Sequence, residues 1–426
     1  MSGISSKVII PLKEFSYEYD GPVFVRGEGI YLYDDFGKKY IDAISGLWNV
    51  PFGYGHSRIT EAVKEQAEQL PYINLYSNFT PVVGKYAEEL LCSMGSPFGK
   101  MIYTCSGSES IECAIKLARK YQRLKGFSNR TKVAVFDISY HGTTYAAMAA
   151  SGMDRSESEF YGPTVPGFVF LKNPFRLEEQ EAIDNIEKVL GNGENVAAVI
   201  IEPVIGSAGV IPVPGWYVKL LKRYTEERGI LLIFDEVATG FGRTGNLFCY
   251  MDMEVFPDIV CLSKGIDNGM IPMGAVVLKK EFVDYFEFNR QYVEHFSTQN
   301  GNPIACAAAL EVLKLLNAPS TLDYVKYIGK YIYNQLDEKL SELLCVRELR
   351  GKGLMLAIDL ATADNKQFTM EQLYAVEKEA KKKGVIVYPF YMENVTSGIN
   401  LFPSYIIDEH ASDRIIDVLY KILKRY

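Results

Sequence analysis

The sequence lacks long apolar runs and an excess of positive charge, and each absence excludes a class of protein. No apolar stretch approaches the twenty residues that a membrane-spanning helix needs. The N-terminal segment MSGISSKVIIPLKEF has only a short apolar run, broken by Pro11 and Lys13, so we expect no signal peptide. The formal net charge of -8 argues against nucleic acid or an anionic membrane as the main partner.

Paired cysteines, internal repeats and low-complexity tracts are also absent. The seven cysteines form no Cys-x-x-Cys pair and mostly lie in apolar segments, which indicates buried thiols in a reducing compartment and no metal site. The composition, 48% hydrophobic and 23% charged, has no signature of disorder. We therefore expect a cytoplasmic globular protein, and 426 residues favour two domains over one core.

Two apolar segments in the middle of the chain each end in a charged side chain. Residues 231–234 lead directly into Asp235, and residues 259–262 lead to Lys264. Short apolar runs before glycine-rich turns are typical of buried parallel strands, and open α/β sheets hold ligands at the carboxyl ends of such strands. We expect two neighbouring strands that present Asp235 and Lys264 to one crevice. An ordinary buried ion pair is the alternative interpretation of these two residues alone.

The motifs DEVATGFGRTG, from Asp235, and SKG, around Lys264, resemble those of the class III pyridoxal-phosphate (PLP) aminotransferases of fold type I. The resemblance implies that Asp235 holds the pyridinium nitrogen of pyridoxal 5'-phosphate and that Lys264 forms its Schiff base. A carboxylate keeps the ring nitrogen protonated, and a partly desolvated lysine suits imine formation and proton transfer. The implied fold is α/β: a large domain with a mainly parallel mixed sheet covered by helices, plus a smaller α+β domain.

The resemblance covers residues 20–420 and suggests a division of the chain. We expect residues 1–55 to form an N-terminal arm and a small sheet of the small domain, 56–309 the large PLP-binding domain, and 310–426 the C-terminal small domain. Asp34, Asp35 and Gly37 mark a hairpin turn. Apolar periodicity predicts helices over 59–70, 81–91, 303–316 and 322–343, and strands at GLMLAIDL, VIVYP and INLFPSYII.

A strand-to-helix turn with the sequence SGS follows the apolar segment MIYTC. Free backbone N–H groups and the positive end of a helix dipole suit a dianionic phosphate there. The turn alone is also consistent with plain N-cap chemistry. The wider pattern SGSES-IE-AIKLAR resembles the phosphate loop of the family, which implies that Ser106, Gly107 and Ser108 contact the cofactor, with Gly107 and Ser108 as the phosphate donors.

Further cofactor contacts are implied by the resemblance. Tyr140, in the triplet YHG, is expected to stack on one face of the PLP ring, with His141 orienting it, and Val237 to pack on the other face. Glu202, at the end of VAAVIIEP, is expected at the edge of the cofactor, where it holds neighbouring polar groups. Thr298 matches a threonine that reaches the PLP phosphate of the neighbouring subunit, so the active site is expected to be complete only in a homodimer.

Aromatic residues in two loops are candidates for the substrate pocket. Trp48 lies in the glycine-rich segment SGLWNVPFGYGH and is our first choice for a side chain that faces the substrate. Tyr76 and Phe79 lie in LPYINLYSNFTP, which the family places at the substrate entrance and the dimer interface. Core packing is the alternative role for each of these three residues.

The sequence departs from the family at positions that recognise substrate carboxylates. Ile205 and Ser207 stand where enzymes for ornithine-like, acetylornithine-like or 4-aminobutyrate substrates have glutamine and often glutamate, and Tyr388 and Asn400 stand where other members have arginine. These departures favour an ω-amine, amino sugar or other specialised donor in a hydrophobic pocket, with Tyr388 as a candidate lining residue. A salt bridge across its own turn is an alternative role for the arginine of GRTG. The remaining candidate carboxylate binders are Arg26, Arg243 and Arg350.

The resemblance implies a PLP-dependent aminotransferase that moves an amino group from an amine or ω-amino donor to a 2-oxo acid, aldehyde or ketone by a ping-pong cycle. Lys264 would be displaced by the donor and would then carry the proton. Another PLP reaction on the same scaffold, by an aminomutase, racemase or phospho-lyase, remains an alternative, and consumption of an external oxo acceptor distinguishes it. A regulatory PLP-binding protein with a degenerate site is disfavoured because Asp235 and Lys264 are both intact.

Overall fold

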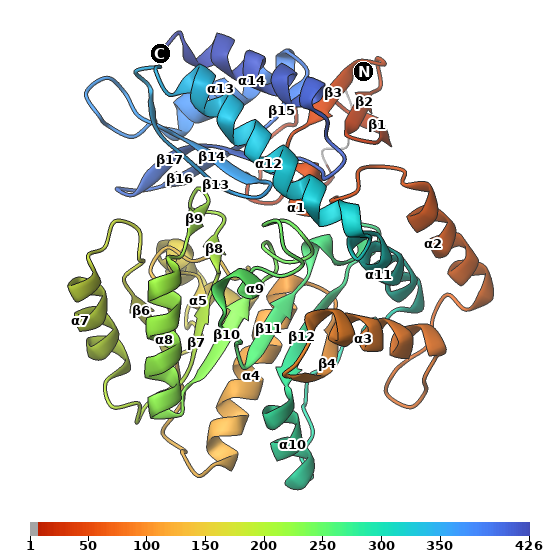
Figure 1. The fold of residues 1–426 in the computed structure, drawn as a ribbon, viewed down its shortest axis with the longest axis vertical. Helices are drawn as coiled ribbons and strands as arrows, with labels where there is room; N and C mark the ends of the chain where they lie inside the picture. The colour runs from red at the N-terminus through yellow and green to blue at the C-terminus, as the bar shows by residue number, and fades with distance from the viewer. Residues whose placement is uncertain (1–6) are drawn as a thin grey trace.

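A seven-stranded sheet forms the centre of the larger of two bodies in the computed structural model, which describes residues 7–426 (Figure 1). Its strand order is β4-β12-β11-β10-β7-β5-β6, and β12 runs antiparallel to both of its neighbours while the other six strands are parallel. The expected mainly parallel mixed sheet is confirmed. The strands are β4 (Phe98–Thr104), β5 (Lys132–Phe136), β6 (Phe168–Leu171), β7 (Val196–Ile201), β10 (Leu231–Asp235), β11 (Ile259–Leu262) and β12 (Gly274–Lys279).

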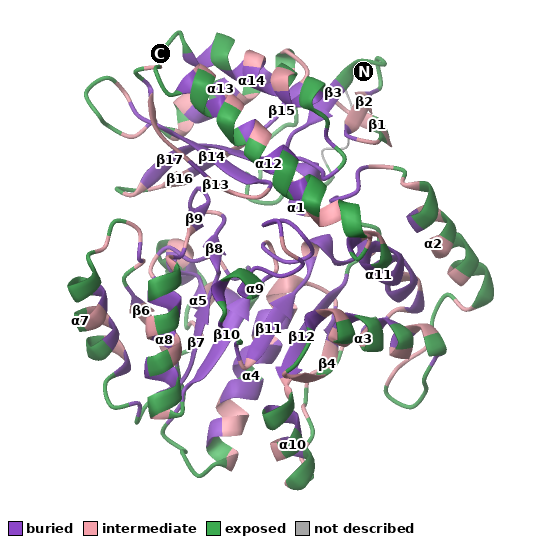
Figure 2. Cartoon of the chain, in the orientation of Figure 1, coloured by how far each residue is buried: buried purple, intermediate pink, exposed green. Residues whose placement is uncertain are grey.

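Helices cover both faces of this sheet, so its central strands are buried on both sides. Every residue of β7, β10 and β11 is buried, as Figure 2 shows. Alternate strand residues point to opposite faces: Ile233 packs in a cluster with α4 (Gly107–Leu124), whereas Phe234 packs in a cluster with α8 (Gly215–Arg228). This two-sided burial explains why the strands read as continuous apolar runs. The other helices of this layer are α7 (Glu179–Leu190) and α10 (Lys280–Phe288).

Three further helices pack together beside the sheet: α2 (Ser57–Gln69), α3 (Pro81–Met94) and α11 (Pro303–Leu316). They occupy the predicted segments to within three residues at each end. Helix α11 begins at Pro303 because the Asn302 side chain accepts hydrogen bonds from the first free N–H groups of the helix, and proline lacks the N–H that would remain unpaired.

The second, C-terminal body is an antiparallel sheet of order β13-β14-β17-β16 packed against three helices. Three of our predicted elements differ here, and the predicted strand VIVYP is divided between β15 (Val385–Ile386) and β16 of two different sheets. The predicted helix 322–343 begins and ends three residues earlier, and the predicted strand INLFPSYII ends at Leu401, because the next N–H bonds Ala43 outside the sheet. The elements are β13 (Val346–Lys352), β14 (Met355–Leu360), β16 (Tyr388–Met392), β17 (Thr396–Leu401), α12 (Pro319–Leu340), α13 (Met370–Lys382) and α14 (Glu409–Leu423).

The N-terminal strands pair with a strand from near the end of the chain. The sheet of order β1-β2-β3-β15 contains β1 (Phe24–Glu28), β2 (Tyr31–Asp34), β3 (Lys39–Asp42) and β15 (Val385–Ile386). The predicted hairpin turn joins β2 to β3, where the Asp34 carboxylate accepts two backbone N–H bonds. The parallel pairing of β3 with β15 attaches residues 24–42 to the C-terminal body.

All seven cysteines are free thiols, and five of them are buried. Within residues 7–426, no helix is long and apolar enough to cross a membrane.

The short elements are α1 (Ser45–Trp48), α5 (Tyr145–Ala150), α6 (Arg155–Phe160), α9 (Tyr250–Met253), β8 (Val204–Ile205), β9 (Ile211–Pro212) and the 3₁₀ turns η1 (Gly152–Asp154) and η2 (Lys264–Asp267).

Candidate active site

The strands β10 and β11 are parallel neighbours, and they bring the predicted acid and amine to one edge of the sheet. Asp235 is the last residue of β10 and lies opposite Cys261 of β11. Lys264 follows β11 by two residues and begins η2 with a φ of 41°, in the left-handed region. The expected delivery of both side chains to the carboxyl edge of one sheet is confirmed.

Asp235 is held by the YHG turn, which follows β5 and is distant in the sequence. Its carboxyl oxygen Oδ2 lies 2.7 Å from His141 Nδ1, and its Oδ1 accepts the N–H of Val237 at 3.0 Å. We expected His141 to orient Tyr140, but the contact of its ring is with Asp235. Ser151 fixes this arrangement, since its hydroxyl accepts the N–H of His141 at 2.8 Å. Sequence reasoning missed Ser151 because no local pattern links it to the triplet.

Lys264 lies against an aromatic wall. Its Nζ is 4.9 Å from the centroid of the Trp48 ring, a cation–π distance. Burial lowers the pKa of Lys264 from its ordinary value, while the negative charges of Asp235 and Glu202 act in the opposite direction. A lowered pKa increases the neutral fraction of the amine, which is the form that attacks a carbonyl carbon.

Trp48 and Tyr388, predicted from distant parts of the chain, meet in this wall. The Trp48 ring stacks on Phe402 with centroids 4.2 Å apart, and its edge contact with Tyr388 spans 5.9 Å. Trp48 is 5% exposed, and its indole N–H has no hydrogen-bond partner among the described residues. A buried, unsatisfied donor beside a reactive amine indicates a surface that a bound molecule completes.

Glu202 connects two turns at the edge of the site. One carboxyl oxygen accepts the N–H of Tyr140 at 2.9 Å, and the other accepts the N–H of Gly206 at 3.1 Å. Burial raises the pKa of Glu202 to about 7. These contacts match the expected role of a carboxylate that holds neighbouring polar groups in place.

The predicted phosphate loop is the first turn of α4. The hydroxyl of Ser106, the N-cap residue, accepts the N–H of Glu109 at 3.1 Å, which leaves other N–H groups of the first turn free for an anion. A Cβ atom at Gly107 would lie 2.8 Å from a methyl group of Val237, and one at Gly142 would overlap the Ser108 hydroxyl. The turn is therefore packed directly against the YHG turn and the end of β10.

The segment that carries Thr298 lies beside this loop. The Cys105 sulfur lies within hydrogen-bonding distance of the Ser297 hydroxyl, at 3.4 Å, and of the Asn300 side-chain oxygen, at 3.3 Å. Thr298 itself is exposed, and its carbonyl accepts a hydrogen bond from Tyr72 at 2.9 Å.

The remaining predicted pocket residues, Tyr76 and Phe79, are on the surface of the single chain. Tyr76 is 84% exposed and Phe79 is 70% exposed. Tyr76 contacts Phe296, with ring centroids 6.2 Å apart, so the loop that holds these two residues and the segment around Thr298 are neighbours. The isolated chain does not bring Tyr76 or Phe79 into the group of residues around Lys264.

The three candidate arginines are engaged elsewhere. Arg243 is 1% exposed and donates to the carbonyls of Leu354 and Pro403 and to a serine hydroxyl. Within residues 7–426 it forms no salt bridge, so the alternative role of an ion pair across its own turn is wrong. Arg350 pairs with the carboxylates of two neighbouring strand residues, and Arg26 forms an exposed ion pair on its own strand.

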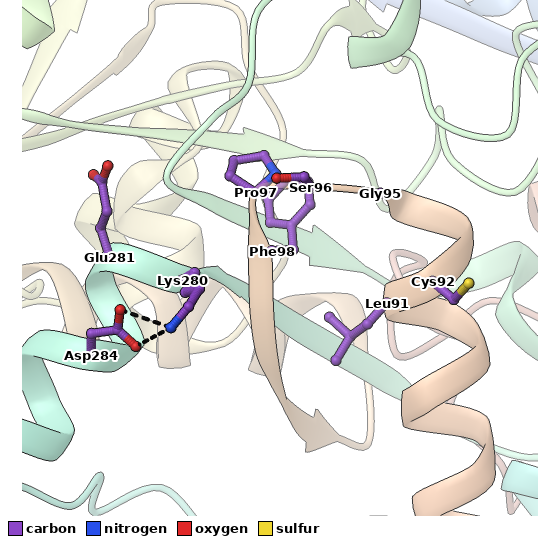
Figure 3. Close-up of a pocket in the computed structure, with 9 residues that line it drawn as sticks. All are labelled: Leu91, Cys92, Gly95, Ser96, Pro97, Phe98, Lys280, Glu281 and Asp284. Carbon is purple, nitrogen blue, oxygen red and sulfur yellow. Dashed lines mark hydrogen bonds and ion pairs between the residues drawn. The ribbon is translucent and has the colours of Figure 1, made fainter.

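A separate surface pocket lies at the other end of the large sheet (Figure 3). It is lined by the end of α3, the start of β4 and the start of α10, and the ion pair of Lys280 with Asp284 stands at its rim. Because Phe98 begins β4 whereas Ser106 follows its end, this pocket and the phosphate loop lie at opposite edges of the sheet. The pocket is unconnected with Asp235 and Lys264.

Comparison with known proteins finds similar sequences and similar structures. The family described as "Aminotransferase class-III" matches residues 17–423. The acetylornithine aminotransferase of Aquifex aeolicus is 36% identical over 94% of this chain and 96% of its own. The adenosylmethionine-8-amino-7-oxononanoate aminotransferase of Methanocaldococcus jannaschii is 32% identical over 97% and 94%. Among solved structures, an (S)-enantioselective ω-transaminase from Thermomicrobium roseum is 34% identical with a TM-score of 0.89, covering 98% of this chain and 96% of its own.

Proposed function

The chain belongs to the class III aminotransferases, and from that premise we propose that it holds PLP at Lys264 and Asp235 and takes its amino group from an amine or ω-amino donor. PLP-dependent transamination is the reaction of this family, and small molecules are its donors and acceptors. The observation that carries the assignment of the site is the partly desolvated Lys264 at one strand end, next to an acid that a histidine fixes at the neighbouring strand end.

The residues present fit the cofactor. The N-terminal N–H groups of α4 with Ser106, Gly107 and Ser108 suit its phosphate, and the lack of a Cβ at Gly107 brings this turn against Val237. The Nε2 atom of His141 is buried without a hydrogen-bond partner in the described part of the chain, so this atom is free to bond a molecule that the protein binds.

The chemistry then divides among the side chains of the chain. PLP, when bound, supplies an electron sink for the carbon that carries the amino group. Lys264 binds the cofactor and moves a proton at the reacting carbon, and Asp235 holds a proton at the ring nitrogen, oriented by His141. Tyr140 and Val237 would flank the ring of the bound cofactor, and Glu202 keeps the backbone of Tyr140 in place.

We propose a homodimer in which Thr298 reaches the phosphate of the partner's cofactor. The exposure of Thr298 and the adjacent exposed aromatics Tyr76, Phe79 and Phe296 support this, because large apolar side chains that are 57–84% exposed are typical of surfaces covered by a partner. The free thiols support a reducing, cytoplasmic compartment. The pairing of β3 with β15 supports a small domain of residues 1–55 and 310–426 beside the large domain of residues 56–309.

The neutral residues at the candidate carboxylate-binding positions support a donor without a carboxylate near its reacting amine. Tyr388 and Asn400 are neutral, and Arg243 and Arg350 already bond carbonyls or carboxylates of the protein. The sequence identity to acetylornithine aminotransferases makes an ω-amino donor of that kind the second candidate. An aminomutase, racemase or phospho-lyase would transform its substrate without consuming an oxo acceptor.

An absorbance experiment tests the proposal. The PLP-loaded protein is mixed with single amines, including ω-amines and N-acetylornithine, in the absence of an acceptor. We expect the cofactor band to convert to that of pyridoxamine phosphate with particular amines, and an added oxo acid to reverse the change. Lys264→Ala should abolish the conversion, whereas Lys280→Ala, at an exposed lysine, should retain it. A loaded protein that converts with no amine contradicts the proposal.

A further inference from the structure

The turn of residues 206–209, between β8 and β9, lies where the two bodies meet (Figure 1). It is closed by the Gly206 carbonyl, which accepts the N–H groups of Gly209 and Val210 at 3.1 and 3.2 Å. Gly209 has a φ of 93°, and a Cβ atom there would lie 2.3 Å from the Phe390 ring of the C-terminal sheet. The turn therefore approaches that sheet as closely as glycine allows.

One face of the C-terminal sheet meets this turn. The strand register places Arg350, Ala357, Asn400 and Tyr388 side by side in one row across all four strands, so these side chains share a face. The Asn400 Nδ2 atom donates to the Gly206 carbonyl at 3.4 Å, and Arg350 Nε donates to the Gly209 carbonyl at 2.9 Å.

Thr396 adds a third bond from the same face. It precedes Asn400 by four residues on β17, and its hydroxyl donates to the Ala208 carbonyl at 2.6 Å. Thr396 and Asn400 have no exposed surface, and Arg350 is 6% exposed. Three buried donors from the C-terminal sheet thus hold three of the four carbonyls of the turn.

The other side of the turn forms part of the candidate active site. A Cβ atom at Gly206 would lie 3.1 Å from the Trp48 ring, the same ring that Lys264 faces. The N–H of Gly206 bonds Glu202, whose other oxygen holds the N–H of Tyr140. The turn therefore links the C-terminal sheet to two residues around Lys264: it contacts Trp48 directly and Tyr140 through Glu202.

We propose that Thr396, Asn400 and Arg350 are positioning residues that set the shape of the amine-donor pocket by holding the turn of residues 206–209 against Trp48. The inference rests on the proposed transamination. None of the three side chains moves a proton. Loosening the turn shifts the wall that receives the body of the donor, while Lys264 and Asp235, on the strands of the large sheet, keep their places. The expected change is therefore in KM for the amine, with kcat preserved.

Thr396→Val is the most specific variant, because it keeps the branched shape and replaces only the hydroxyl with a methyl group. In the half-reaction with an amine that the wild-type protein accepts, we expect KM to rise roughly threefold to tenfold, the range for one lost neutral hydrogen bond. Thr396→Ser, which restores the hydroxyl, should recover most of the affinity.

Ser397→Ala is the matched control. Ser397 is the next residue of β17, is equally buried, and donates its hydroxyl to the Leu360 carbonyl within the C-terminal sheet at 2.9 Å. Its loss should lower stability without raising KM. An unchanged KM in Thr396→Val, or an equal rise in Ser397→Ala, overturns the inference.

Fluorescence gives a readout that does not depend on activity. The chain has two tryptophans, Trp48 and Trp216, so a Trp216→Phe background reports Trp48 alone. Thr396→Val in this background should shift the emission of Trp48 and increase its quenching by acrylamide, and Ser397→Ala should change neither. Unchanged emission in Thr396→Val refutes the inference even if no amine reacts, whereas a wild-type protein inert to every amine refutes the proposed function.

Discussion

Replacing Arg243 with methionine is expected to weaken the attachment of the C-terminal body to the large body. The guanidinium group follows β10 of the large sheet and donates from Nη1 to the carbonyls of Leu354 and Pro403 and from Nη2 to the Ser45 hydroxyl at 2.9 Å. Leu354 precedes β14, and Pro403 lies just beyond β17. One buried side chain therefore joins the loop after β10 to residues that flank β14 and β17 of the other sheet.

The magnitude follows from the number of acceptors left without a donor. Each buried acceptor that loses its partner costs about 1–3 kcal/mol. Methionine occupies a similar volume and avoids the desolvation of a charge, which offsets part of that loss. We expect Arg243→Met to lower the free energy of unfolding by about 3 kcal/mol, the lower end of the sum over its three acceptors.

Urea titration at a fixed PLP concentration measures this loss. With a slope near 3 kcal/mol per molar urea, the midpoint should fall by about 1 M. Arg26→Met is the matched control: the Arg26 side chain is 56% exposed in its ion pair with Glu28, and its removal should cost under about 1 kcal/mol. Equal midpoints for the two variants would refute the reasoning. If Arg243→Met instead keeps its stability and loses only its activity with oxo acceptors that contain a carboxylate, Arg243 binds an anion.

Two further predictions follow from the site and its surroundings. Burial raises the pKa of Glu236 from 4.5 to about 7, so the folded state keeps a proton that the unfolded chain releases. The contribution of this group to stability falls as pH rises from 4.5 to 7, by up to about 1.4 kcal/mol per pH unit, and Glu236→Gln should remove that slope from the urea midpoints; parallel profiles would contradict it. Gly107→Ala places a Cβ 2.8 Å from Val237 and should weaken PLP retention roughly tenfold in a fluorescence titration, whereas Gly215→Ala, where a Cβ meets nothing within 4 Å, should retain PLP normally.

Local signals were sufficient to place Asp235 and Lys264 at one edge of a sheet, and the family resemblance supplied their roles. Asp235 and Lys264 each end an apolar run of strand length, and parallel strands in an open sheet deliver such residues to one edge. The turn at Ser106 was also predictable from local patterns, because a strand and an amphipathic helix flank it. Boundaries that depend on distant contacts were less accurate. The strand β17 ends where the following N–H bonds the Ala43 carbonyl, and no residue near Leu401 predicts that partner.

The sequence by itself determined the order of the main elements and the residue types at the carboxyl edge of the large sheet, since periodicity and turn residues act over a few neighbouring positions. The mainly parallel character of that sheet was implied by the family resemblance. Only the tertiary structure decided which distant groups complete the site. His141 meets Asp235 across 94 positions, Arg243 meets Pro403 across 160, and Asn400 meets Gly206 across 194. Such pairs leave no local pattern, because their geometry arises only when distant segments pack together and buried polar groups must find partners.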